Sequence, residues 1–333
     1  MGIFDRLFGK KAQSAGVQAP SESPTVVKAS FSNRFLRIMK INFYGPFSKS
    51  TSGEWVVAWR DLDPEQHRGG YRESGLGDYL LFNTRTNSVV LQGKMERPNH
   101  GHVANDGHFS LEDWHFGSEL SGTFYVFSPT GKPKIKRAVN ANIFNSALSD
   151  DGRFAVFQTA NNPNSDDGNL LVALDVEHNK ELFAIHPQTG WANKYEFEEN
   201  PLSIVVSLNG IGKFRYDMQG NFINAKKYQT ACLNSKRYEV VLPTVAELLK
   251  TDVVSKEDAQ KALEATISAR SLGADNDKGW KATALKLQGQ ANEALGNIED
   301  AIAAYEEALS INPKIGVKQR MGTLKKKRPS SAK

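Results

Sequence analysis

Glycine-led strands at an almost constant interval constrain this chain more than any other feature of its sequence. Four segments begin with glycine and continue with strand-forming apolar residues, namely 77–82, 122–127, 168–174 and 212–216. Their first residues are 45, 46 and 44 positions apart. A period of this length predicts several copies of one sheet unit and argues against a single irregular fold.

Each predicted unit contains four strands. A polar turn and an alternating apolar strand precede each glycine-led strand, at 52–59, 106–111, 151–157 and 200–206. The clearest copy is 149–158, in which Asp150, Asp151 and Gly152 have the chemistry of a tight hairpin turn. One strand before this turn and one after the glycine-led strand complete the unit.

This pattern resembles the β-propeller superfamily, in a form that lacks the Gly-His and Trp-Asp signatures of WD repeats. The resemblance covers residues 26–242 and implies a small β-propeller-like domain of four to five blades. Segments 26–36 and 230–242 fall outside the four clear units and could combine into a closing or fifth blade. Open repeat sheets, or assembly with a second copy of the chain, would also satisfy the period.

At Pro243 the pattern becomes helical. A short helix is predicted at 244–250, and Ser255 is predicted to cap the next one, whose first turn is acidic. Small, aromatic and helix-ending residues then recur at fixed spacing: Leu285, Gly289, Leu295, Gly296, Ala301, Tyr305, Ala308 and Pro313. Over 282–315 these spacings resemble one tetratricopeptide repeat, with departures at Gln288 and Asn292.

The resemblance implies a helical domain at 243–324, with a capping helix at 317–324, so the whole chain is expected to be mainly β with a C-terminal α region. Tetratricopeptide repeats generally bind peptides or partner proteins, which makes Asn292 and Tyr305 candidate partner-binding residues here. Packing against the propeller-like domain is the alternative role. In the β region, the candidate anchors are three aromatic residues on predicted loops, Tyr71, Trp114 and Trp191.

The two ends of the chain differ from its body. Residues 1–11 place Ile3, Phe4, Leu7 and Phe8 at helical spacing, which suits a membrane surface or a partner's groove, and 12–25 are expected to be a flexible linker. The net charge is +5, yet the chain from Lys314 onward holds eight basic residues and no acidic one. Nucleic-acid binding is therefore expected only through the basic, disordered tail at 325–333.

Membrane crossing and disulfide chemistry are not expected from this sequence. No apolar run approaches the roughly 20 residues of a membrane-spanning helix. The single cysteine, Cys232, excludes an intramolecular disulfide and is expected to be a small buried hydrophobe. These features suit a cytoplasmic protein, with contact at the membrane periphery as an option through the N-terminal segment.

Four histidines lie close together in the sequence: His100, His102, His108 and His115. Imidazole and carboxylate side chains could hold zinc or a similar ion, but this spacing matches no metal motif. Turn formation explains the paired aspartates better than calcium binding does, at Asp150, Asp151, Asp166 and Asp167. No cofactor is expected.

The sequence favours a non-catalytic protein-interaction or scaffold function. It carries no nucleophile elbow, no phosphate-binding loop and no Cys-His pair. The alternative is an enzyme or small-ligand binder with a polar site at the propeller axis. In that case, Glu112, Asp113 and His115 should converge on one channel with shifted pKa values.

Overall fold

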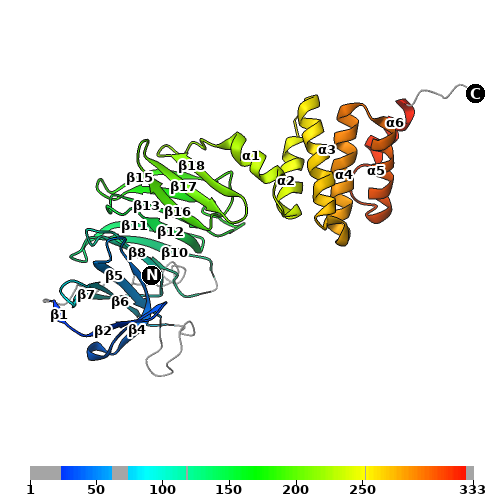
Figure 1. The fold of residues 1–333 in the computed structure, drawn as a ribbon. Coiled ribbons are helices and arrows are strands. Elements are labelled where there is room, and N and C mark those ends of the chain that lie inside the picture. The colour runs from blue at the N-terminus through cyan, green and yellow to red at the C-terminus, as the bar shows by residue number, and fades with distance from the viewer. Residues whose placement is uncertain (1–23, 62–73, 118, 252, 328–333) are drawn as a thin grey trace, which may run out of the picture. The chain divides into compact units, whose positions relative to one another are not determined.

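The computed structural model describes residues 24–61, 74–117, 119–251 and 253–327 (Figure 1). These residues form two compact units. The sheet unit extends to Ser207 and includes Arg215–Ile223, and the helical unit comprises Leu208–Phe214 and the chain from Asn224 onward. The protein is mainly β with a C-terminal helical region, as predicted.

Four antiparallel sheets follow one another along the chain (Figure 1). The core of the first is β4 (Phe43–Lys49), β5 (Trp55–Arg60), β6 (Gly77–Asn83) and β7 (Ser88–Met95). The second is β8 (Pro98–Val103), β9 (Phe109–Asp113), β10 (Gly122–Phe127) and β11 (Pro133–Val139). The third is β12 (Ile143–Leu148), β13 (Phe154–Thr159), β14 (Leu171–Asp175) and β15 (Lys180–Ile185), and the fourth is β16 (Lys194–Glu198), β17 (Ser203–Leu208) and β18 (Gly212–Asp217).

The predicted repeat is confirmed as a propeller-like arrangement of these sheets. Gly77, Gly122 and Gly212 begin β6, β10 and β18, and Gly168 lies three residues before β14. The first strand of each later sheet faces the sheet before it, because β8 contacts β4 and β5, β12 contacts β8 and β9, and β16 contacts β12. The fourth sheet has three strands, one fewer than the predicted unit.

The fifth blade considered from the sequence is not formed by the described residues. Residues 25–38 instead extend the first sheet, where β1 (Thr25–Val26) pairs with β7. Beyond β4, the same sheet continues into β3 (Phe35–Ile38) and β2 (Ala29–Phe31), and a short 3-10 turn at Met39–Ile41 joins β3 to β4. Among the described strands, none of the first sheet pairs with one of the fourth.

The cores of the sheet unit lie between successive sheets because each central strand buries both of its faces. In β10, Tyr125 and Phe127 join a cluster with the first sheet, whereas Phe124 and Val126 join a cluster with the third. Phe124 stacks on Phe157 across the second interface, with ring centroids 4.9 Å apart. Each sheet is therefore covered by its neighbours, as stacked blades require.

Six helices form the described part of the helical unit (Figure 1). They are α1 (Ala225–Leu233), α2 (Tyr238–Leu248), α3 (Lys256–Ser271), α4 (Lys278–Leu295), α5 (Ile298–Ile311) and α6 (Lys318–Lys327), with a 3-10 turn at Ala274–Asn276. Each helix packs on the next one in the chain. Ser255 caps α3 as predicted, since its Oγ accepts a hydrogen bond of 3.0 Å from the backbone N–H of Asp258.

Helix begins earlier than the sequence indicated. We placed the change at residue 243, but α1 begins at Ala225 and Pro243 lies inside α2. Pro243 has no N–H to donate to the carbonyl of Glu239 one turn before it, and both residues are exposed. Val241, Leu242 and other apolar residues of this helix are buried. Their packing stabilises the helix although the local sequence predicts it only weakly.

The C-terminal helix also extends further than predicted. Val317 and Leu324 are buried, which suits the capping role expected of 317–324. However, residues 325–327, which we assigned to a disordered tail, form the last turn of α6. Lys325 lies in this turn, with its Nζ 2.6 Å from Glu306 Oε1 on α5.

None of the helices in the described part of the chain is long and apolar enough to cross a membrane. The segment carrying Ile3, Phe4, Leu7 and Phe8, the linker up to residue 23 and residues 328–333 lie outside the described residues.

Candidate functional site

The third sheet carries an exposed pair of aromatic rings. Phe144 on β12 is 47% exposed, and Trp191, in the segment between β15 and β16, is 46% exposed. Their ring centroids are 5.4 Å apart and the ring planes differ by 28°. Trp191 was a candidate from the sequence, whereas Phe144 was not.

A β-bulge explains why Phe144 is exposed. On the partner strand β13, Thr159 pairs with Ile143 and Gln158 pairs with Asn145, which leaves Phe144 as the extra residue. A bulge interrupts the alternation of a strand and can direct a side chain out of the sheet. Sequence alternation alone could not show this, because a bulge depends on the pairing with the neighbouring strand.

The segment that carries Trp191 is fixed to the third sheet by hydrogen bonds. Trp191 Nε1 donates to the Thr159 carbonyl at 3.1 Å. The Gln158 amide donates to the Gly190 carbonyl at 3.0 Å and accepts from the Ala192 N–H at 3.2 Å. Trp191 is therefore held in place while much of its ring stays open to solvent.

A buried hydrogen bond of Tyr195 strengthens this support. Its hydroxyl donates to Gln158 Oε1. Burial raises the pKa of Tyr195, so the hydroxyl remains a donor over the whole physiological range. Phe144 and Trp191 thus lie on a fixed base, which is the arrangement expected of an interface anchor because little conformational freedom is lost on binding.

A buried carboxylate connects the second and third sheets. Glu112 accepts hydrogen bonds from Ser146 Oγ at 2.7 Å and from Trp114 Nε1 at 3.2 Å, and its Oε1 lies 3.6 Å from His100 Nδ1. Burial alone would raise the pKa of Glu112, but these donors outweigh it and hold that pKa below its ordinary value. Glu112 therefore remains charged and joins the two sheets.

His102 lies beside this carboxylate. Its ring is 4.7 Å from that of His100, and its Nε2 is buried with no hydrogen-bond partner among the described residues. Burial and, to a smaller extent, the nearby His100 lower the pKa of His102 to about 4. His102 is consequently neutral at neutral pH.

The four histidines do not meet at one site. His108 pairs with Asp106 at 2.7 Å inside a turn, and His115 bonds through its ring to Ser121 and Thr123. Within the described residues, no three side chains of histidine, cysteine, aspartate or glutamate come together in a way that could hold a metal ion. The short sequence spacing is misleading because it spans two strands and two separate loops.

An axial site would require Glu112, Asp113 and His115 to converge on one channel, and these residues do not converge. Glu112 and Asp113 are consecutive in β9, so their side chains leave opposite faces of the sheet. Asp113 instead accepts hydrogen bonds from the backbone N–H of Arg97 at 2.8 Å and of His115 at 3.4 Å. Burial raises the pKa of Asp113, yet its partners lie in the segments just before β8 and just after β9 and not around Glu112.

Two predicted partner-binding residues of the helical unit are buried. Tyr305 is fully buried and its hydroxyl donates to Glu293 at 2.8 Å. Asn292 is 3% exposed and its Oδ1 accepts a hydrogen bond from Asn297. Both residues support the α4–α5 hairpin, so neither is available to a partner. In the β region, Trp114 is half-buried and Tyr71 lies outside the described residues.

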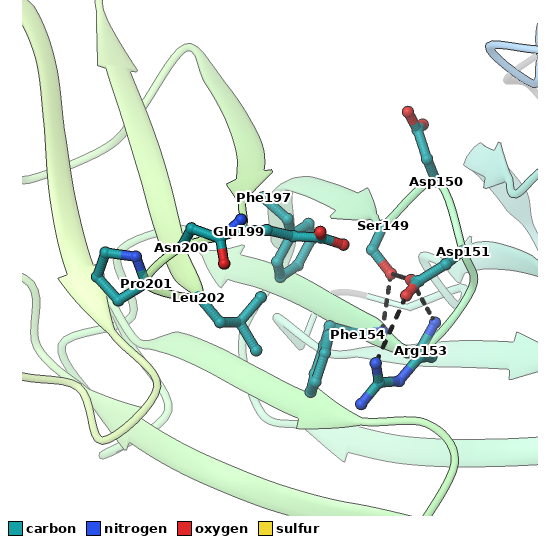
Figure 2. A pocket seen from close by; sticks show the side chains of 10 residues that line it. All are labelled: Ser149, Asp150, Asp151, Arg153, Phe154, Phe197, Glu199, Asn200, Pro201 and Leu202. Carbon is teal, nitrogen blue, oxygen red and sulfur yellow. Dashed lines mark hydrogen bonds and ion pairs between the residues drawn. The ribbon is translucent and has the colours of Figure 1, made fainter.

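The hairpin turn at Ser149–Arg153 borders a pocket that sequence reasoning missed (Figure 2). The turn itself was predicted. Asp151 Oδ1 accepts from Ser149 Oγ at 2.6 Å and from the Arg153 N–H at 3.0 Å, and Gly152 has φ of +72°. The other side of the pocket comes from the turn between β16 and β17, far away in sequence.

The comparisons with known proteins agree with the helical prediction. A family model described as tetratricopeptide repeat matches residues 282–315. No curated protein has a sequence that matches this chain.

The solved structures similar to this chain include two propellers. The structure of the Dos1 propeller has 12% identity and a TM-score of 0.39, over 59% of this chain and 56% of that one. The Cps50 (Swd1) β-propeller domain of Myceliophteria thermophila has 9% identity and a TM-score of 0.32, over 61% and 67%. The chain thus spans little more than half of the first structure, and the description of the fold rests on the sheet topology above.

Proposed function

We propose that this chain is a non-catalytic protein-interaction protein whose sheet unit binds a partner through Phe144 and Trp191. The observation that carries the proposal is the exposure of two stacked rings on a hydrogen-bonded base. Large aromatic residues supply much of the binding energy in protein interfaces, above all where they are held rigidly. Phe144–Trp191 is called the aromatic pair below.

The two folds favour the same function. Propeller-like sheets and tetratricopeptide repeats are both typical of protein-interaction modules. A cytoplasmic location, a membrane contact through Ile3, Phe4, Leu7 and Phe8, and a nucleic-acid contact through the basic tail remain predictions from the sequence.

Site-specific photo-cross-linking in cells tests the proposal. A photoreactive phenylalanine analogue replaces Phe144 in the full-length chain, and the same analogue replaces Tyr44 in a control. Tyr44 is a matched position because it is 51% exposed and stacks on Phe35 at 5.0 Å, on the first sheet. We expect a cross-linked protein species from position 144 that position 44 does not give.

The Trp191→Ala variant distinguishes specific binding from random collision. In this background, the species linked to position 144 should disappear, because half of the aromatic pair is missing. Identical products from positions 144 and 44, or products that persist without the Trp191 ring, would overturn the proposal.

A further inference from the structure

The pocket beside Ser149 lies at the other end of β12 from Phe144. Its volume is about 530 Å³, and its walls come from the turns that follow β12 and β16. Apolar side chains and three carboxylates dominate the lining: Phe154, Phe197, Pro201, Leu202, Asp150, Asp151 and Glu199. Figure 2 shows them on the two facing turns.

The aromatic wall of the pocket suits a cationic group with an apolar stem. Phe154 and Phe197 stack with ring centroids 6.2 Å apart and planes at 28°. The guanidinium of Arg153 already lies 5.1 Å from the centroid of the Phe154 ring. Aromatic faces attract cations through their quadrupole, and the Phe197 ring and Leu202 provide further apolar surface in the same pocket.

The carboxylates of the pocket differ in whether they already have hydrogen-bond or ion-pair partners. Asp151 is already hydrogen-bonded within the turn. The Arg153 guanidinium pairs with the carboxylates of Asp151 at 4.0 Å and Glu177 at 3.5 Å. Asp150 and Glu199 are exposed, and within the described residues their carboxylates form no ion pair and no hydrogen bond. In Figure 2, Glu199 extends into the space between the turns and Asp150 lies at the outer edge.

A second hollow lies on the other side of the same turn. It has a volume of about 260 Å³, shares Asp151 and Arg153 with the pocket, and adds Asp106, Lys134 and Glu177. The two hollows together expose five carboxylates against two lysine or arginine side chains. This excess of carboxylates across both hollows suits an extended occupant with positive charge.

We propose that the pocket binds a lysine or arginine side chain from an extended basic segment of a partner protein. The stem of that side chain packs on Phe197 and Leu202 while its cationic head pairs with Glu199 and Asp150. The rest of the segment crosses the turn toward Glu177. This site is independent of the aromatic pair, which lies at the opposite end of β12.

Titration of the full-length chain with short blocked peptides tests the proposal. The probe is acetyl-Gly-Lys-Gly-Lys-Gly-amide, compared with the peptide in which glutamine replaces both lysines. We expect binding of the lysine peptide only, weaker at high salt, and about two- to fivefold weaker with Glu199→Gln because one exposed charge pair is lost. Asp166→Asn is the matched control, since Asp166 is an exposed carboxylate that lines a different hollow.

Three results would overturn the proposal. The lysine peptide could fail to bind, the glutamine peptide could bind equally well, or Asp166→Asn could weaken binding as much as Glu199→Gln. Binding of acetyl-lysine amide as tightly as the peptide would instead identify a small-molecule cation site. None of these outcomes depends on Trp191, so the test is separate from that of the proposed function.

Discussion

His102 illustrates how one residue ties the stability of the sheet unit to pH. Its buried imidazole faces His100 and Glu112, and the fold holds its pKa at about 4 against an ordinary value of 6.5. In the unfolded chain, His102 takes up a proton below about pH 6.5, whereas in the folded chain it remains neutral down to about pH 4. Proton uptake therefore favours the unfolded state within this window.

His102→Gln should flatten that pH dependence. The wild-type chain is expected to lose up to about 3 kcal/mol of folding free energy as the pH falls from 6.5 to 4, and the variant should lose less. Urea denaturation of both full-length proteins across this range measures the difference. Above pH 7, the two curves should run parallel because the histidine is neutral in both states. Equal slopes between pH 6.5 and 4 would show that His102 does not control the effect.

At the scale of elements, close packing sets the geometry of the α4–α5 hairpin. A Cβ added at Gly289 would stand 2.4 Å from the Tyr305 ring, so only glycine lets the two helices approach this closely. Gly322 in α6 is different, since outside its own helix no described atom lies within 4 Å of such a Cβ. The two glycines therefore form a matched pair.

Gly289→Ala should destabilise the helical unit by about 1–3 kcal/mol, because overpacking outweighs the gain in helix propensity. Gly322→Ala should instead stabilise α6 by about 0.5–1 kcal/mol. Thermal melting followed by circular dichroism at a helical wavelength measures both. The explanation fails if the two substitutions shift the melting temperature in the same direction.

Element prediction from the sequence was good where local chemistry decides the structure. The turn at Ser149–Arg153 was predicted because aspartate and glycine satisfy a tight turn within a few residues. The α4–α5 hairpin was predicted because its small residues keep the repeat spacing. By contrast, α1 and the start of α2 were missed, since the burial of Val241 and Leu242 depends on neighbouring helices.

At the scale of the whole molecule, the sequence period predicted the four sheets but not the proposed binding surfaces. The aromatic pair depends on a bulge at Phe144, and the pocket depends on two turns about 50 residues apart. The four histidines are close in sequence and two of them meet on β8, yet His108 and His115 lie in separate loops. Repetition can be seen in a single sequence, whereas cross-strand register and contacts between sheets require the structure.

The affinity of a cross-linked partner for the wild-type chain and for Trp191→Ala tests the central claim most directly. We expect Trp191→Ala to weaken binding by about 30-fold or more, or about 2 kcal/mol, because it removes half of an exposed aromatic anchor. Tyr44→Ala should leave the affinity unchanged. Equal affinity of the partner for the wild-type chain and Trp191→Ala would contradict the claim that the aromatic pair is the binding surface.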